Sequence, residues 1–408
     1  DAVTRQFFAA QDREADWREF LPDPDAGYDE VIELDLGQIE PGVARPHSPD
    51  NVCTVRAAGP VVAHQVLIGS CTNSSFRDLT VVAAMLKGKR VHPDVSFGVV
   101  PGSRQVLRMI TDSGALNAII DAGARLLESG CGFCAGYGQS PQSGGNSIRT
   151  NNRNFEGRSG TRDAQVYLVS PEVAAATALR GVLTDPRDLG MAYPEVTLPG
   201  RFYINDALFI QPGDGSTAVF RGPNIGEPPR IAPLPEELRA GVAIKLGDQI
   251  TTDHIIATGS VSRYRSNIPK SSEYVFQRFD PEFVARCRRN QELHLSSVIV
   301  AGLSYGQGSS REHAALCPAY LGVRIVIAKS IERIHGANLV NFGILPLNFT
   351  DPRDYERIGL GDELFIAEAR SAVKQPVIVV ENSTRKEAYR VRHDLTPRQI
   401  ALILMTQG

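Results

Sequence analysis

The chain has 408 residues, of which 42% are hydrophobic and 22% charged, and its formal net charge is −3. This composition is ordinary for a globular protein, and the length predicts two or three domains. There is no basic excess of the kind that indicates nucleic-acid binding, and no apolar run is long enough to span a membrane. The 6 cysteines are too few for a disulfide scaffold, so the sequence indicates a reducing compartment.

Strand-like and helix-like segments alternate through the first half of the chain. Residues 30–36 alternate polar and apolar side chains, which predicts a half-buried strand. Residues 61–68 end at Gly69, which predicts a strand leading into a tight turn. We further predict a helix over 80–86, a strand over 95–100, an N-cap at Ser103 and helical segments over 106–110 and 118–127. This alternation is typical of an α/β protein with a parallel or mixed sheet.

A change in composition separates the two halves. Residues 138–163 are rich in glycine and poor in apolar residues, which predicts a long functional loop, and a helix is predicted over 173–179. Proline and glycine then recur from about 183 to 237, as in a stiffened linker. From 241 we predict a second α/β unit, with strands over 242–246, 297–301, 324–328, 364–366 and 377–380 and a last helix that begins at Thr396 and Pro397.

Three cysteines stand in turns that could hold a metal. Cys71 follows a predicted strand, and Cys131 and Cys134 form a Cys-x-x-Cys pair. Three thiolates are one short of a closed zinc site or of the usual iron–sulfur complement, so an iron–sulfur cubane held by them would keep one iron open as a Lewis acid. A structural metal site and incidental thiols are the alternatives, and Cys53, Cys287 and Cys317 are predicted to be small buried residues.

Polar loops offer candidate anion sites in both halves. Arg153 and Arg158 lie five residues apart in one loop and can pair with carboxylates, or they are solvated arginines. The Asp253-His254 turn is read either as a structural turn or as part of a site, and Arg263 and Arg265 follow it.

A glycine-rich turn precedes a predicted helix in the second half. Ser309 and Glu312 have the spacing of a capping box, so Ser309 is read as a helix cap. A helix N-terminus beside Arg311 would also favour an anion and a serine that acts as a base.

Six segments together resemble the aconitase family in their order and spacing. They are Gly69–Asn73, Cys131–Cys134, Asn152–Arg158, Thr252–Ile255, Gly308–His313 and Arg324–His335. The resemblance extends from about residue 47 to about residue 349. It implies an α/β fold with an aconitase-like cluster-binding α/β/α domain over 58–200 and a C-terminal swivelling β/α domain over 239–408. It also implies that residues 1–57 are the tail of a preceding α/β domain and that residues 201–238 are a proline-rich linker.

The resemblance implies an iron–sulfur hydro-lyase, namely an aconitate hydratase of the tricarboxylic acid cycle that interconverts citrate and isocitrate through cis-aconitate. By motif match, a [4Fe–4S] cluster would be held by Cys71, Cys131 and Cys134, with Asn152 as a nearby donor. Ser309 would be the catalytic base. The carboxylates of a small tricarboxylic acid would be held by Arg153, Arg158, Arg265, Ser310 and Arg311, with Arg263 as the rival of Arg265.

Aconitases begin with a large domain that supplies further catalytic groups, including the acid for the leaving hydroxyl. Residues 1–57 show no counterpart, so we expect the missing domain to be supplied in cis or by a separate chain, and this chain alone to turn over little. The expected location is the bacterial cytoplasm or the mitochondrial matrix. The alternatives are a related hydro-lyase for homoaconitate, isopropylmalate or methylcitrate, and a cluster-less RNA-binding regulator, which the acidic charge balance disfavours.

Overall fold

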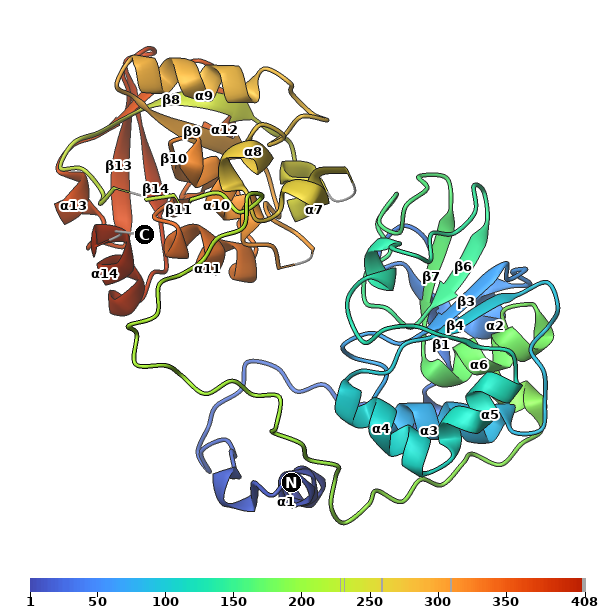
Figure 1. The fold of residues 1–408 in the computed structure, drawn as a ribbon. Coiled ribbons are helices and arrows are strands. Elements are labelled where there is room, and N and C mark those ends of the chain that lie inside the picture. The colour runs from blue at the N-terminus through green and yellow to red at the C-terminus, as the bar shows by residue number, and fades with distance from the viewer. Residues whose placement is uncertain (228, 231, 258–259, 309, 406–408) are drawn as a thin grey trace. The chain divides into compact units, whose positions relative to one another are not determined.

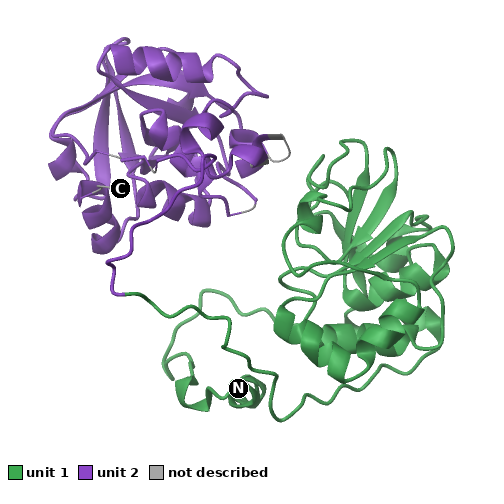
Figure 2. Ribbon diagram, in the orientation of Figure 1, with its two compact units in different colours: residues 1–213 green, residues 214–408 purple. Residues whose placement is uncertain are grey.

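The computed structural model describes residues 1–227, 229–230, 232–257, 260–308 and 310–405. The chain forms two compact units, Asp1–Gly213 (unit 1) and Asp214–Gly408 (unit 2), coloured separately in Figure 2. The boundary lies within the predicted linker segment 201–238. None of the described helices is both long and apolar enough to cross a membrane.

Unit 1 is built on a seven-stranded mixed sheet with the strand order β2-β1-β7-β6-β3-β4-β5. The strands are β1 (Gly42–Ala44), β2 (Val52–Thr54), β3 (Gln65–Ile68), β4 (Ser96–Val99), β5 (Arg125–Leu126), β6 (Asn146–Arg149) and β7 (Gln165–Val169). Strands β3 to β7 pair in parallel, whereas β1 is antiparallel to both β2 and β7. The boundary predicted after residue 57 therefore differs from the structure, because β1 and β2 are hydrogen-bonded into the sheet of the following residues.

Helices cover one face of this sheet, as Figure 1 shows for α3, α4, α5 and α6. The helices of unit 1 are α1 (Ala2–Ala10), α2 (Val55–Ala58), α3 (Phe76–Leu86), α4 (Arg104–Asp112), α5 (Ala115–Asp121) and α6 (Pro171–Arg180), with 3-10 turns η1 (Glu14–Asp16), η2 (Leu36–Gln38), η3 (Phe133–Ala135) and η4 (Pro186–Leu189). Val66 and Ile68 of β3 pack in the core beneath these helices. Leu67 points to the opposite face, where it packs with Phe133 from the segment that carries two of the cysteines.

The structure confirms most of the predicted elements of unit 1 and corrects three. Ser103 caps α4 as predicted. Residues 30–35 form no strand, because no described segment pairs with them, and their apolar side chains are exposed. The predicted loop 138–163 contains strand β6, whose polar residues Ser147 and Arg149 face other buried polar groups. The predicted helix 118–127 ends at Asp121, because Gly123 adopts a positive φ of 106° and the chain then enters β5.

Unit 2 is a closed barrel with the strand order β10-β11-β14-β13-β12-β8-β9. The strands are β8 (Leu238–Lys245), β9 (Ser296–Ala301), β10 (Val323–Ala328), β11 (Leu345–Phe349), β12 (Glu363–Ile366), β13 (Val377–Asn382) and β14 (Glu387–Arg392). Apolar side chains from all seven strands fill the barrel, and a second apolar cluster lies between the barrel and its helices. The five predicted strands are confirmed, whereas β11 and β14, which close the barrel, were not predicted.

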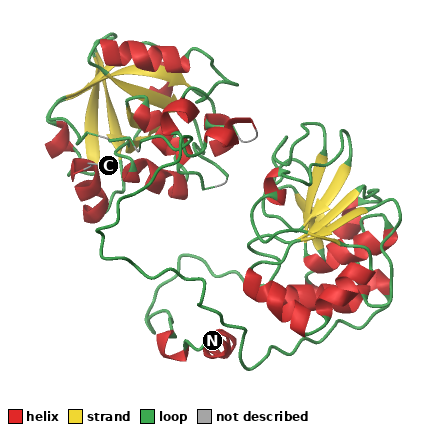
Figure 3. Ribbon diagram, in the orientation of Figure 1, coloured by secondary structure: helices red, strands yellow, loops and turns green. Residues whose placement is uncertain are grey.

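Helices surround this barrel, as the red segments of Figure 3 show. They are α7 (Thr252–Ile255), α8 (Ile268–Ser272), α9 (Phe283–Glu292), α10 (His313–Tyr320), α11 (Arg333–Asn341), α12 (Asp354–Arg357), α13 (Ala369–Ala372) and α14 (Pro397–Met405), with the 3-10 turn η5 (Ser260–Tyr264). The last helix begins at Pro397 as predicted. Helix α10 begins at His313 with Glu312 as its N-cap, and Leu316 N donates to Glu312 O. The predicted cap at Ser309 lies outside the described residues.

Candidate functional site

The turn that carries Cys71 leaves the carboxyl end of β3 and is fastened to the segment after β6. Gly69 N donates to Thr150 Oγ1 over 2.8 Å, and Asn73 Nδ2 donates to Thr150 O over 2.7 Å. The Cys71 side chain is free, and the residue is exposed. Because carboxyl ends of parallel strands are where α/β proteins place ligands, this turn lies in the expected position for a site.

The second cysteine-bearing segment packs directly against the first. Phe133 lies between Cys131 and Cys134, is 3% exposed, and packs with Leu67 and Val100. A Cβ atom at Gly69 would lie 2.7 Å from Val100 Cβ and 3.2 Å from Phe133 Cζ. The absence of a side chain at Gly69 therefore lets the two cysteine turns approach one another.

The third segment of the site is the loop that follows β6. Arg158 Nη2 donates to Cys134 Sγ over 3.8 Å, and Arg153 Nη1 donates to the main-chain oxygen of Asn152 over 2.7 Å. Asn152, Arg153 and Arg158 are all half-buried. The structure thus brings these three predicted residues into the loop beside the cysteine turns.

Sequence reasoning missed two buried residues at this site. Asn151 is 4% exposed, and within the described part of the chain neither its Nδ2 nor its Oδ1 has a hydrogen-bond partner. Arg149 is fully buried, and its Nη1 donates to Phe133 O over 2.9 Å. In the sequence, Arg149 stands between Ile148 and Thr150 at the end of a short strand. A charged residue in this position is the signal that could have identified it.

The donor set is compatible with an iron–sulfur cluster. Over the described ranges, no three cysteine, histidine or carboxylate side chains converge in the manner of a mononuclear metal site. A cubane contacts each thiolate through a different iron, so its cysteines need no common point. Three free cysteines on adjacent turns are compatible with such a group, as is the buried and unpaired amide of Asn151 in the segment that follows β6. Cys71, Cys131 and Cys134 are the residues that would hold it.

The predicted polar residues of unit 2 lie around α7 and α10. Arg311 Nη1 is 2.6 Å from Asp253 Oδ1, and the same nitrogen is 3.3 Å from Ile256 O. His313 Nε2 lies 2.7 Å from Arg265 O, so the main chain at Arg265 lies against α10. The Arg265 and Ser310 residues are exposed. The ion pair between Asp253 and Arg311 was not predicted, although both residues were singled out.

The turn before α7 is a reciprocal cap. Thr251 Oγ1 accepts from His254 N, and His254 Nδ1 accepts from Thr251 N, each over 3.1 Å. Burial lowers the pKa of His254, and the charge of Asp253 opposes that shift. The structure therefore supports the structural interpretation of His254 and places Asp253 as the residue that faces the arginine.

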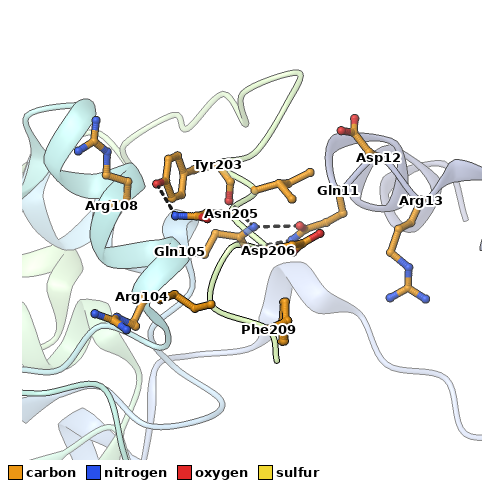
Figure 4. Close-up of a pocket in the computed structure, with 12 residues that line it drawn as sticks. Gln11, Asp12, Arg13, Arg104, Gln105, Arg108, Tyr203, Asn205, Asp206 and Phe209 are labelled. Atoms are coloured by element: carbon orange, nitrogen blue, oxygen red, sulfur yellow. Dashed lines mark hydrogen bonds between the residues drawn. The ribbon is translucent and has the colours of Figure 1, made fainter. Parts of the chain in front are cut away.

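A pocket elsewhere in unit 1 contains none of the predicted site residues. It has a volume of about 950 Å³ and lies between α1, α4 and the segment 203–209 (Figure 4). Its lining includes Arg13, Arg104 and Arg108, and Gln11 and Gln105 are hydrogen-bonded across it. The candidate site is identified by its donor groups and not by the size of its cavity.

These features define a class of protein: a two-unit α/β protein in which a mixed sheet carries three free cysteines beside an arginine loop and a barrel carries an arginine–carboxylate pair. Residues 2–181 match the sequence model of the aconitase family (aconitate hydratase), and residues 256–352 match that of the aconitase C-terminal domain. The chain belongs to the aconitase family, as its motifs predict.

Relatives with different named substrates match this chain. It is 31% identical over 398 residues to the mitochondrial homocitrate dehydratase of Saccharomyces cerevisiae, an alignment that covers 84% of this chain and 50% of that protein. It is 30% identical over 406 residues to the mitochondrial aconitate hydratase of the same yeast, covering 84% and 51%. It is 41% identical over 189 residues to the large subunit 2 of 3-isopropylmalate dehydratase from Archaeoglobus fulgidus, covering 46% and 45%. The chain spans about half the length of these relatives.

Proposed function

We propose that the protein is the cluster-carrying part of an aconitate hydratase, a hydro-lyase that isomerises a tricarboxylic acid by removing and re-adding water. The observation that carries the proposal is the meeting of three segments at one edge of the sheet of unit 1. These segments are the Cys71 turn, the Cys131–Cys134 loop and the Asn152–Arg158 loop. Family membership and relatives that are named as hydratases and dehydratases support it.

The residues of the chain have separate tasks in this proposal. When bound, a [4Fe–4S] cluster with an open iron supplies a Lewis acid for the substrate hydroxyl. Arg153 and Arg158 bind substrate carboxylates, because a guanidinium offers paired donors to a carboxylate. Asn152 donates near the cluster ligands.

Unit 2 would supply the remaining groups that the resemblance implies. Arg311 binds a carboxylate already, since it pairs with Asp253 at 2.6 Å. Arg265 and Ser310 would add contacts to the substrate, and both are exposed in this unit. Ser309, outside the described residues, would remove the proton from the carbon beside a carboxylate, favoured by the positive charge of Arg311.

The substrate is the finer part of the proposal. We favour cis-aconitate, and homoaconitate, isopropylmalate and methylcitrate are the alternatives. Relatives named for homocitrate and 3-isopropylmalate support the first two of these alternatives. We also propose that a further domain, in the same or a separate chain, completes the enzyme, and that it works in the bacterial cytoplasm or the mitochondrial matrix.

The test begins with the mass of the protein isolated from its source and the identity of any co-purifying chain. The intact material, reconstituted anaerobically with iron and sulfide, is then assayed for hydration of cis-aconitate, cis-homoaconitate and isopropylmaleate. Fastest hydration of cis-aconitate supports the proposal. Faster hydration of another alkene reassigns the substrate, and no hydration of any of them contradicts a hydro-lyase.

Cys131→Ser tests the ligand set separately from turnover. Loss of one of three thiolates should abolish the visible cluster absorbance together with activity, because a serine hydroxyl is a poor ligand for iron in such a site. Cys53→Ser is the matched control, because Cys53 is a free cysteine on β2 that belongs to none of the motifs assigned to the cluster. Cluster absorbance that survives in Cys131→Ser would contradict the assignment of Cys131.

A further inference from the structure

Arg149 uses every hydrogen of its guanidinium in a fully buried position at the end of β6. Its Nε donates to Ser147 Oγ over 2.7 Å, and its Nη1 donates to Phe133 O over 2.9 Å and Ser159 Oγ over 3.0 Å. Its Nη2 donates to Gln65 Oε1 and to Gln139 O, each over 2.8 Å. The residue is 0% exposed, so no water replaces these contacts.

All five acceptors are neutral, so no carboxylate among them balances the charge of Arg149. A buried charge without a partner is costly, and buried charges in proteins are normally paired. Burial lowers the pKa of Arg149 to about 10, and the negative charge of a Cys134 thiolate opposes that shift. The side chain therefore stays cationic at neutral pH.

The contacts of Arg149 join the sheet to the cysteine loop. Gln65 and Ser147 belong to β3 and β6, the two central strands that meet beneath the site. Phe133 O and Gln139 O belong to the segment that contains Cys134 and the residues after it. Phe133 O also accepts from Gly136 N, and Gln139 O also accepts from Gln65 Nε2. Removal of the guanidinium would nevertheless break two hydrogen bonds that join the loop to the sheet and so loosen the loop.

We propose that Arg149 is a positioning residue that fixes the cysteine loop on the sheet and places an unbalanced positive charge beneath the anionic group held by Cys71, Cys131 and Cys134. The nature of that group as an iron–sulfur cluster rests on the proposed function. A thiolate-bound cluster becomes more negative when it is reduced, so a nearby cation favours its reduced state and raises its midpoint potential.

Two substitutions in the full chain separate the charge from the hydrogen bonds. Arg149→Lys keeps the charge but loses the fork of donors, whereas Arg149→Met removes both. Arg125→Met is the matched control, because it removes an exposed arginine from β5 of the same sheet and changes the net charge equally. Each variant is compared by hydrogen exchange of residues 131–140 without iron, and by iron content and midpoint potential after anaerobic reconstitution.

We expect exchange in residues 131–140 to rise by roughly tenfold or more in both Arg149 variants and to stay unchanged in Arg125→Met. The midpoint potential should fall in Arg149→Met and stay close to the native value in Arg149→Lys. The midpoint potentials could instead be equal in the native chain, Arg149→Lys and Arg149→Met. That result would leave Arg149 a structural role only and overturn the proposal that its charge affects the cluster. Unchanged exchange in both variants would overturn the positioning part.

The two proposals fail in different ways. A native chain that takes up no iron would refute the cluster, while the exchange measurement on the same chain would still decide whether Arg149 holds the loop. If Arg149→Met does not fold, Arg149→Gln replaces it as the uncharged variant that retains hydrogen-bonding groups. A potential of Arg149→Gln equal to that of Arg149→Lys would then overturn the charge part.

Discussion

Individual buried polar side chains in unit 2 have chemical consequences that can be measured apart from catalysis. His335 is 2% exposed and lies with its ring edge-on to Tyr305 at a centroid distance of 5.2 Å. Within the described residues neither ring nitrogen has a hydrogen-bond partner. Burial lowers the pKa of His335 to about 4, so the folded protein holds this imidazole neutral.

This depressed pKa predicts a loss of stability in mild acid. Above pH 6.5, the ordinary pKa of histidine, His335 is neutral in the folded and unfolded states and has no effect. Between pH 6.5 and about 4 only the unfolded state binds the proton, so the free energy of unfolding falls, by roughly 3 kcal/mol in full. His335→Leu should flatten this dependence in urea titrations across that pH range.

The exposed His294 provides the control for this measurement. His294→Asn should keep the native pH dependence, because it leaves the buried His335 in place. An unchanged slope in His335→Leu would contradict the neutral, buried state of His335.

At the same scale, spacing in the sequence predicted which residues carry chemistry but not how they pair. Cys71, Cys131, Arg153 and Arg158 stand in local motifs, so short-range patterns were sufficient to select them. Arg149 escaped notice because its five acceptors come from positions 65 to 159, and only the folded register brings them together. The pair of Asp253 with Arg311 likewise joins residues from two separate turns.

Among the structural elements, the turn after β3 depends on one glycine. An alanine at Gly69 would press against Val100 and Phe133, at distances that real Cβ atoms rarely show. Gly69→Ala should therefore push the Cys71 turn away from the Cys131–Cys134 loop and lower iron uptake during reconstitution by roughly tenfold, which corresponds to about 1.4 kcal/mol of strain on the cluster-binding geometry. Iron and sulfide content per chain is the measurement.

Gly130→Ala is the matched control, because a Cβ atom at Gly130 would meet nothing within 4 Å. It should take up iron as the native chain does. Equal iron uptake by Gly69→Ala and Gly130→Ala would show that the close approach of the two turns is not needed for binding.

Local patterns predicted those elements that their apolar pattern alone identifies. Apolar runs identified β3, β9 and β10, because strands buried on both faces have continuous apolar sequence. The alternating residues 30–36 gave a wrong strand, because a strand also needs a partner that a local pattern does not contain. Strand β6 was missed because its buried face is polar and its partners, such as Gln65, are distant in the sequence.

At the scale of the whole molecule, each unit has apolar cores of its own. The clusters of unit 1 draw on residues between Ala10 and Phe202, and those of unit 2 on residues between Leu234 and Ile403. The three cysteines of the candidate site belong to unit 1, and the three histidines whose pKa is lowered by burial, His254, His335 and His393, belong to unit 2. Cluster binding should therefore stabilise unit 1, whereas mild acid should destabilise unit 2.

We expect the full chain to unfold in two calorimetric transitions, because separate cores unfold as separate cooperative units. Anaerobic reconstitution with iron and sulfide should raise the midpoint of one transition only, that of unit 1, since a ligand stabilises the fold that binds it. Lowering the pH from 6.5 toward 4 should lower the midpoint of the other transition more, because the buried histidines of unit 2 must remain neutral to stay folded. His335→Leu identifies that transition, as it should reduce its pH dependence alone. A single transition that responds to both iron and His335→Leu would contradict this division of the molecule.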